Sequence, residues 1–535
     1  MDEVPAERVI FITDIEGSWQ ALARSIACLQ GRGLRVKVPD SDLGSQFLTS
    51  GPLELDPGWA LVIGGDLTDR GAESRRIVRA LLELKRACPQ RCHLLLGNRD
   101  IGKIRLTSEL ATDQLAFADM PRPSWRKDAA ASTLAQFLER CEAPNTAGMR
   151  LRWFLKCTSG AERGFAFRRE ELQRECGGDL PSDDAVVASF LDDLAAPHGA
   201  LRELLHEGVL AYLHPSSGTL FVHGGVVGTF RNLPQHVLGV IPGRAGRVRD
   251  VAQWVAKLNE WKDLQLAEWE RDPQFFSPQL SAIPYDPVVG TRRGGDALIS
   301  YAQPNSPWPS CVAAKGAGID RETRAPKAFP ANVNHWLVSS GVRRVCSGHT
   351  PQGDTPTLVR GEHDTLMILA DTSHSDLKAP DSRGIAAAAV VVHGETTEVC
   401  GQCSDGTEYS YFLPQDPWVG EWLLDGRLVK ARLSTPSSNC LSTAPKAVYL
   451  VARWQGYQIK HERLTLEDLA AIGKATRMEH TASCVSAQLV RLKTTVSVVE
   501  GPMTSSTWHS SSSLNTGSDP KESSNSGSSK ERSSL

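Results

Sequence analysis

Short runs of apolar, often β-branched residues recur along the chain, and each ends in a polar side chain beside glycine. Five of them are Val9–Asp14, Leu61–Asp66, Leu94–Asn98, Leu220–His223 and Val345–His349. Runs this short and this apolar are typical of strands that are covered on both faces of a sheet. The pattern therefore predicts buried strands that each deliver a polar residue to their carboxyl end.

Two of the predicted strands are followed by helical patterns. Their apolar positions are Trp19, Leu22, Ile26 and Leu29 before Gly31, and Ile77, Val78, Leu81, Leu82 and Leu84 before Pro89. A strand, a polar terminus, a helix and another strand in succession indicate an α/β fold. Because ligands of such sheets collect at the carboxyl ends of the strands, we expect the polar residues to share one edge.

The remaining stretches predict the organisation of the chain. We expect a main domain over residues 1–400, interrupted by helical insertions at about 101–214 and 232–333. A small C-terminal region over 401–500 could be rich in β-structure, and 14 serines among residues 505–535 predict a disordered tail over 501–535. Within the second insertion a helical stripe predicts core packing, formed by Trp254, Leu258, Trp261, Leu264 and Trp269.

Charge and cysteine content narrow the class of protein. The 59 basic and 62 acidic side chains leave a formal net charge of −3, which argues against nucleic-acid binding. We see no signal-peptide pattern, and the longest apolar run, Ile385–Val392, is too short to cross a bilayer. The 12 irregularly spaced cysteines fit a reducing compartment. We expect a cytoplasmic protein without membrane attachment, with the nucleus as an alternative; the sequence does not indicate an oligomeric state.

Five polar blocks carry the candidate chemistry. They are Asp14-Ile15-Glu16-Gly17, Gly65-Asp66-Leu67-Thr68-Asp69-Arg70-Gly71, Gly97-Asn98-Arg99-Asp100, His223-Gly224-Gly225 and Gly348-His349-Thr350-Pro351. Their order resembles the calcineurin-like metallophosphoesterases, above all PPP-type serine/threonine phosphatases and diadenosine tetraphosphatases. The DIEG and GNRD blocks resemble a divergent subgroup. The resemblance spans about residues 8–395 outside the insertions and implies a sandwich of two mixed β-sheets flanked by helices.

The residue types in these blocks suit a pair of divalent cations, which requires a bridging carboxylate and further oxygen and nitrogen donors. Asp66 is the candidate bridge; Asp14 and Glu16 would complete one site, and Asn98, His223 and His349 the other. Such a pair of ions lowers the pKa of a bridging water, and the resulting hydroxide attacks phosphorus. Because Glu16 stands where the family usually has histidine, we favour Mn²⁺ or Mg²⁺, with iron or zinc as alternatives.

Three further residues suit phosphate chemistry. Arg70 can hold phosphate oxygens with two hydrogen bonds. The third block of the family usually carries a general-acid histidine paired with the aspartate that is Asp69 here, but Arg99 takes its place. A guanidinium group keeps its proton, so we expect Arg99 to pair with Asp69, contact phosphate and stabilise the leaving oxygen. Loss of a general acid typically costs about 10²–10⁴-fold in rate, unless His374 or a metal-bound water replaces it.

The predicted activity is metal-dependent hydrolysis of a phosphorylated protein or nucleotide. Phosphomonoesters, such as protein phosphoserine and phosphothreonine, and the phosphoanhydrides of dinucleoside polyphosphates remain alternative substrates. A competing interpretation is a catalytically weak or inactive phosphate-binding scaffold, because Arg99 replaces the general acid. Asp371-Thr372 resembles a strand-ending element of the tetraphosphatases or is a simple turn, and Arg292-Arg293 is a second phosphate clamp or a solvated loop.

Overall fold

The computed structural model describes residues 6–37, 51–116, 118, 120, 132–230, 238–273, 295–320, 322–434, 447–456 and 458–475. Contacts divide the chain into a first unit, residues 1–475, and a second, residues 476–535. The second unit, which includes the predicted serine-rich tail, lies outside the described residues.

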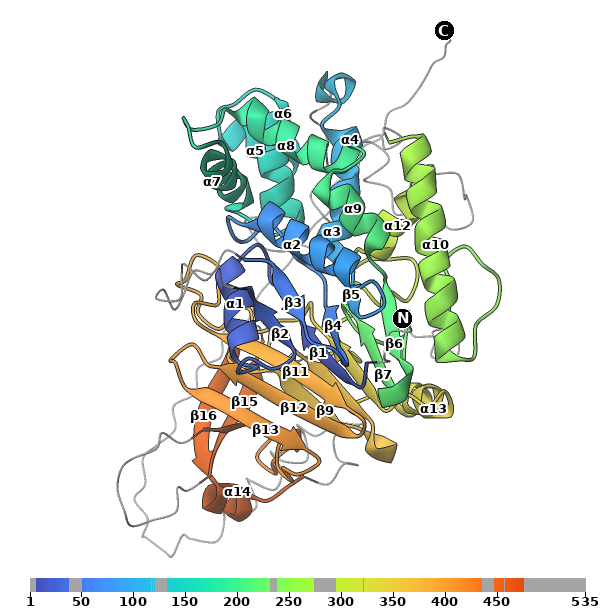
Figure 1. The fold of residues 1–535 in the computed structure, drawn as a ribbon, viewed down its shortest axis with the longest axis vertical. Coiled ribbons are helices and arrows are strands. Elements are labelled where there is room, and N and C mark those ends of the chain that lie inside the picture. The colour runs from blue at the N-terminus through green and yellow to red at the C-terminus, as the bar shows by residue number, and fades with distance from the viewer. Residues whose placement is uncertain are drawn as a thin grey trace, which may run out of the picture. The chain divides into compact units, whose positions relative to one another are not determined.

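The larger of two main sheets has nine strands in the order β16-β15-β14-β13-β12-β11-β1-β4-β5 (Figure 1). The strands are β1 (Arg8–Ile12), β4 (Trp59–Ile63), β5 (Cys92–Leu94), β11 (Ala387–His393), β12 (Thr396–Gln402), β13 (Glu408–Leu413), β14 (Leu428–Leu433), β15 (Val448–Gln455) and β16 (Gln458–Thr465). Strands β1, β4 and β5 are parallel, whereas β1 pairs with β11 in the antiparallel sense. The predicted C-terminal region thus continues this sheet through β13–β16.

The second sheet has five strands in the order β6-β7-β8-β10-β9. They are β6 (Ala211–His214), β7 (Thr219–Val222), β8 (Arg344–Ser347), β9 (Thr357–Arg360) and β10 (Leu366–Leu369). Strands β7, β8 and β10 are parallel, and β6 and β9 flank them in the antiparallel sense. A separate hairpin joins β2 (Leu34–Val36) to β3 (Leu53–Leu55).

Alternating side chains of β1 explain why these strands are apolar on both faces. Val9 and Phe11 belong to a core shared with the second sheet, where the ring of Phe11 lies 5.4 Å from that of Phe221. Ile10 and Ile12 belong to the opposite core, with helices α1 (Trp19–Ala27) and α2 (Ser74–Ala87). The predicted α/β sandwich of two mixed sheets flanked by helices is therefore confirmed.

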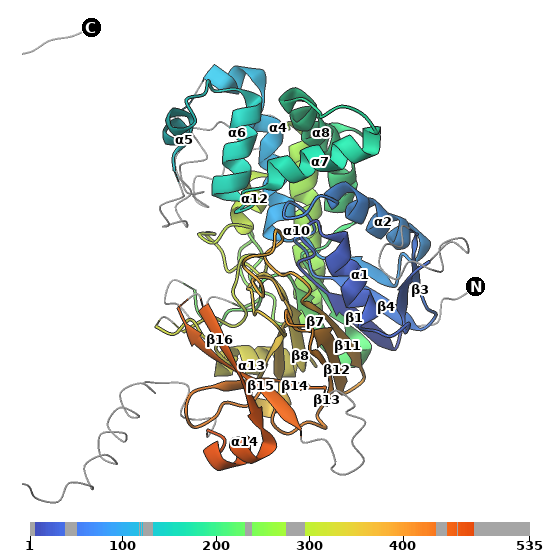
Figure 2. The same ribbon diagram turned by 90° about the vertical axis from the view of Figure 1, so that its left-hand side faces the viewer.

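Among the described residues of the first predicted insertion, helices predominate as far as Glu207, whereas its last residues form β6 of the second sheet, so the predicted end at about 214 is too late. The ribbon views place most of these helices together beyond one end of the sheets (Figures 1 and 2). They are α3 (Asn98–Gly102), α4 (Leu106–Glu109), α5 (Leu134–Arg140), α6 (Ala147–Trp153), α7 (Gly164–Cys176), α8 (Asp183–Ala195) and α9 (Ala200–Glu207). A buried ion pair joins Arg168 of α7 to Asp193 of α8 at 2.5 Å. Asp193 also accepts a hydrogen bond of 3.2 Å from Arg75 of α2, so charges link the insertion to the α/β core.

The tryptophan stripe of the second insertion lies on α10 (Val251–Arg271). Three tryptophans and Leu258 are buried, but Leu264 is 51% exposed, so its prediction as a core residue is wrong. At 3.6 residues per turn Leu264 falls about 120° away from the centre of the buried face, and Leu266 is buried instead. Two shorter helices, α12 (Asp296–Tyr301) and α13 (Ala331–Ser339), follow, and α14 (Leu466–Ile472) comes after the last strand.

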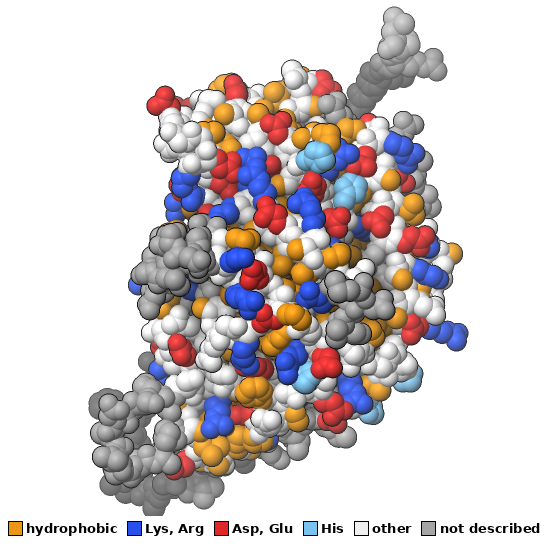
Figure 3. Space-filling model, viewed as in Figure 1, with side chains coloured by type: hydrophobic (Ala, Val, Ile, Leu, Met, Phe, Trp, Pro, Cys, Tyr) orange, Lys and Arg blue, Asp and Glu red, His pale blue; other side chains and the backbone are white. Residues whose placement is uncertain are grey.

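The surface mixes charges of both signs. Figure 3 shows Lys and Arg side chains interspersed with Asp and Glu over the face that it displays. Among the helices of the described residues, none combines the length and apolar character that crossing a membrane requires.

Candidate metal and phosphate site

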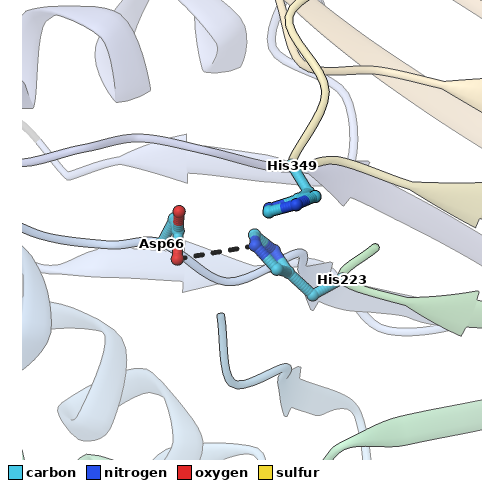
Figure 4. A group of neighbouring side chains, drawn as sticks. All are labelled: Asp66, His223 and His349. Atoms are coloured by element: carbon cyan, nitrogen blue, oxygen red, sulfur yellow. Dashed lines mark ion pairs between the residues drawn. The ribbon is translucent and has the colours of Figure 1, made fainter. Parts of the chain in front are cut away.

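Metal-competent side chains from both sheets meet at the carboxyl ends of their strands. Two overlapping groups have candidate ligand atoms within 4.8 Å of one another: Asp66 with His223 and His349, and Asp66 with Asp14 and Glu16. Figure 4 shows the side chains of the first group pointing toward one another. Asn98, just beyond β5, completes the set, with Oδ1 3.2 Å from His223 Nε2. The six residues predicted as metal ligands therefore lie together.

The backbone around the site is strained in the way that close convergence requires. Positive φ angles occur at Asp14 (51°), Glu16 (54°), Asp66 (51°) and His349 (64°). This left-handed conformation is uncommon outside glycine and concentrates at functional sites. A Cβ on Gly348 would lie 2.0 Å from Asp14 Oδ2, and one on Gly97 would lie 2.1 Å from Asp66 Oδ1. These two glycines let the loops after different strands approach.

Hydrogen bonding leaves acceptor atoms facing one another around His223. The fully buried His223 ring places Nδ1 2.7 Å from the carbonyl oxygen of Gly64, where Nδ1–H donates. In the neutral ring with this tautomer, Nε2 carries a lone pair, and it lies 3.5 Å from Asp66 Oδ1 and 3.2 Å from Asn98 Oδ1. Nitrogen and oxygen lone pairs that converge without a donor fit a cation, and a backbone carbonyl on the opposite ring nitrogen is a common support for a metal-binding histidine.

The charge states of Asp66 and His349 also suit a cation. Burial lowers the pKa of His349 to about 3, and the charges of Lys315 and Arg99 act in the same direction. His349 is therefore neutral at neutral pH and offers a lone pair. Burial alone would raise the pKa of Asp66, but its surroundings, which include the permanent charge of Arg99 and the hydrogen bond from the Arg99 backbone N–H, lower the pKa, so the carboxylate is ionised.

Asp14 and Asp100 organise the acidic side of the site. Thr13 Oγ1 donates to Asp14 Oδ2 at 2.6 Å, and the backbone N–H of His349 donates to the same oxygen at 3.0 Å. Asp100 accepts hydrogen bonds from the backbone N–H groups of Asp66 and Gly97, both at 2.9 Å. Burial, and then the charge of Asp66, raise the pKa of Asp100 to about 6. Asp100 thereby fixes two of the polar blocks relative to each other.

Three guanidinium groups surround the Glu16 carboxylate, which is 3% exposed. Arg70 Nη1 donates to Oε1 at 3.1 Å and to Oε2 at 3.4 Å, and Arg99 Nη1 also donates to Oε1. Arg383 Nη2 donates to Oε2 at 2.9 Å and to the Asp14 carbonyl oxygen at 2.5 Å. Burial opposes ionisation, but Arg70, Arg99 and Arg383 hold the pKa of Glu16 well below its ordinary value.

The predicted pairing of Asp69 with Arg99 is wrong. Asp69 instead pairs with Lys103, whose Nζ lies 2.8 Å from Oδ2, while Arg99 is paired with Glu16. Lys103 follows Arg99 by one helical turn, and its fully buried ammonium group also donates to Thr68 Oγ1 at 2.7 Å and to the Arg99 carbonyl oxygen at 3.0 Å. A long, flexible lysine can reach Asp69 from this turn, which leaves the Arg99 guanidinium free to turn toward Glu16.

Several other residues lie around the site, and the sequence motifs include some of them but not others. Asp100 belongs to the Gly97-Asn98-Arg99-Asp100 block, whereas Arg383 belongs to no motif of the sequence. Asp371 follows β10, is buried, and has its pKa raised by burial and by the charge of Glu16. The pKa of His374 is lowered by desolvation and then by the charge of Arg70. The candidate clamp Arg292-Arg293 lies outside the described residues.

The loop around Gly160, within the first helical insertion, also contacts the site. Arg70 Nε and Nη2 lie 3.4 and 3.2 Å from the carbonyl oxygen of Gly160 and donate to it. This contact orients the guanidinium whose Nη1 faces Glu16. The Arg70 side chain is 20% exposed and that of Arg99 is 10% exposed, so both reach solvent at the edge of the cluster.

Of the comparisons with known proteins, the one with solved structures finds similar proteins. No protein-family model matches the chain, and a search of curated proteins finds no match. The chain is similar to a cold-active protein-tyrosine phosphatase of a psychrophilic Shewanella species, with 13% identity and a TM-score of 0.35 over 77% of this chain and 82% of that one. It is also similar to a protein serine/threonine phosphatase from Saccharomyces cerevisiae, with 11% identity and a TM-score of 0.29 over 73% and 74% of the two chains. These neighbours are phosphatases, and the likeness concerns the fold alone.

Proposed function

We propose that this protein is a metal-dependent phosphoester hydrolase. The observation that carries the proposal is the convergence of Asp66, Asn98, His223 and His349 beside two solvent-reaching arginines. The acceptor atoms suit a divalent cation, and the guanidinium groups suit an anion with several oxygens. Few substrates other than phosphate esters and anhydrides call for both within one cluster.

The proposed roles follow from the positions of the side chains. Arg70 and Arg99 bind and orient the phosphate oxygens. Because Arg99 keeps its charge, it stabilises the leaving oxygen without giving it a proton. Asp100 and Lys103 hold the loops that carry these groups. A divalent cation, for which we propose Mn²⁺ or Mg²⁺, supplies Lewis acidity toward phosphate and a more acidic water as nucleophile.

The lack of a proton donor at position 99 bears on the substrate. A phosphoanhydride or an aryl ester has a stable leaving group, whereas an alkyl ester such as phosphoserine needs protonation of its leaving oxygen more strongly. We therefore place dinucleoside polyphosphates ahead of phosphoserine and phosphothreonine proteins as proposed substrates.

A scaffold that binds phosphate without turning it over is the second candidate. One observation favours it. Arg99, which stands where the family has its general-acid histidine, donates a hydrogen bond from its guanidinium group to the buried Glu16, so that donor is already in use.

The experiment that separates the two candidates measures turnover of an aryl phosphate and of a dinucleoside polyphosphate with added Mn²⁺. We expect Mn²⁺-dependent turnover in the wild type and its loss in Asp66→Asn. Asp192→Asn, at an exposed position on α8, is the matched control and should behave like the wild type. No turnover in the wild type, with activity gained in Arg99→His, would establish the scaffold. Equal turnover in the wild type and Asp66→Asn would show that the residue assignment is wrong.

A further inference from the structure

The Glu16 carboxylate has no acceptor position left for a metal ion. An ionised carboxylate offers about four lone-pair positions on its two oxygens. Oε1 accepts from Arg70 and Arg99, and Oε2 accepts from Arg70 and Arg383. A cation could bind Glu16 only after at least one of these charge-assisted hydrogen bonds had broken, inside a cluster whose carboxylate is nearly fully buried.

Fixed positive charges already surround Glu16. Arg70, Arg99 and Arg383 each form an ion pair with its carboxylate, and Arg99 Nε also lies 3.6 Å from Asp66 Oδ2. Because guanidinium groups do not lose their protons in proteins, a doubly charged ion placed beside Glu16 would be repelled by three permanent positive charges in a poorly solvated site.

The histidine group has the opposite character. Asp66 Oδ1, Asn98 Oδ1 and His223 Nε2 converge as acceptors, and the His349 ring lies 5.1 Å from the His223 ring, centroid to centroid. Asp66 Oδ1 accepts one hydrogen bond, of 2.9 Å, from the Arg99 backbone N–H, which leaves lone-pair capacity for a cation. The two halves of the site therefore differ in what they can bind, although both contain Asp66.

We propose that the site holds one divalent cation, at Asp66, Asn98, His223 and His349, and that the guanidinium groups of Arg99, Arg70 and Arg383 stand in place of a second cation around Glu16. This inference rests on the proposed metal-dependent function and revises the pair of ions expected from the sequence. Arg99 and Arg70 then serve as the fixed positive charges that meet the phosphate, and Glu16 holds them in position.

The test counts bound ions and does not depend on turnover. The full-length protein is stripped with a chelator, dialysed and titrated with Mn²⁺, and bound Mn²⁺ per chain is measured by equilibrium dialysis and elemental analysis. Electron paramagnetic resonance of the bound Mn²⁺ reports whether it is isolated or exchange-coupled to a second ion. We expect one Mn²⁺ per chain with an isolated-ion spectrum.

Two isosteric amide variants locate the ion. Glu16→Gln should keep one Mn²⁺ per chain, because Glu16 is not a ligand, whereas Asp66→Asn should weaken Mn²⁺ binding at least about 10-fold. Two ions per chain, a coupled spectrum, or loss of an ion in Glu16→Gln would overturn the inference. If Glu16→Gln does not fold, the wild-type count and spectrum still decide.

The same measurements separate this inference from the proposed function. One bound Mn²⁺ without turnover would sustain the single-cation site and refute the hydrolase. Turnover with two bound Mn²⁺ would sustain the hydrolase and refute the single-cation site. A wild type that binds no Mn²⁺ would refute both.

Discussion

Replacing Lys103 by methionine tests the pair that took the place of the expected Asp69–Arg99 contact. The Lys103 ammonium group is fully buried and has three partners: Asp69 Oδ2 at 2.8 Å, Thr68 Oγ1 at 2.7 Å and the Arg99 carbonyl oxygen at 3.0 Å. Methionine has a similar length but offers no hydrogen-bond donor. The variant therefore leaves Asp69, which is 4% exposed, as a buried carboxylate without its counter-ion.

The magnitude follows from the cost of breaking a buried ion pair. Removing one partner of such a pair typically lowers the free energy of unfolding by about 3–5 kcal/mol, because the remaining charge stays desolvated. Two hydrogen bonds donated by the charged group are lost as well, and they are part of that figure. We expect Lys103→Met to lie in this range.

The assay is urea unfolding followed by tryptophan fluorescence and circular dichroism. Lys257→Met, at an exposed position on α10, is the matched control and should change the free energy of unfolding by less than about 0.5 kcal/mol. Adding Asp69→Asn to Lys103→Met should recover part of the loss, since the stranded charge is removed. A loss below about 1 kcal/mol in Lys103→Met, or no recovery in the double variant, would refute the reasoning.

Three further predictions concern the close approach of loops, pH and metal removal. Gly97→Ala should cost at least about 10-fold in Mn²⁺ affinity by titration, because its Cβ would meet Asp66 Oδ1 at 2.1 Å; unchanged affinity would contradict the close approach. Burial lowers the pKa of Lys430 to about 7 against its ordinary 10.5, so between these values the unfolded chain binds more protons and stability rises with pH, by up to about 1.4 kcal/mol per pH unit. Urea unfolding between pH 7 and 10 should show the wild type gaining stability relative to Lys430→Met as the pH rises, and parallel curves would contradict this. Chelation should abolish turnover and lower the thermal midpoint, with both restored by Mn²⁺; turnover that survives chelation would exclude a role for the metal.

Periodicity was sufficient for the α/β framework, because the strands that carry the site are buried on both faces and read as continuous apolar runs. Val9–Phe11 and Leu61–Ile63 lie in β1 and β4 as predicted. The error at Leu264 has a geometric cause: apolar character alone does not say where a residue falls around a long helix, and 100° per residue carries it off the buried face.

The sequence predicted which residues form the candidate site, but it did not predict which charged side chains pair with one another. Fixed positions beside glycine at strand ends identified the residues from Asp14 to His349 that the structure brings together. The pairing of charges depends on how far each side chain reaches across the loops, and the spacing of residues in the sequence does not give that reach. Lys103 displaced Arg99 from Asp69, and Arg383 arrives from a loop after Asp371 that carries no motif.

Strand β1 lies between β4 and β11, so its two neighbours come from segments that are far apart in the chain. Ile10 is paired with Leu61 on one side and with Val391 on the other. During synthesis, Asp14 emerges more than three hundred residues before β11, which pairs with β1, and before the loop that carries His349. A nascent chain must therefore keep an apolar strand with one open edge until late in translation, and such edges invite pairing with other chains. Assembly of the proposed cation site is accordingly a late event, because its ligands cannot meet until the loop after β8 has emerged.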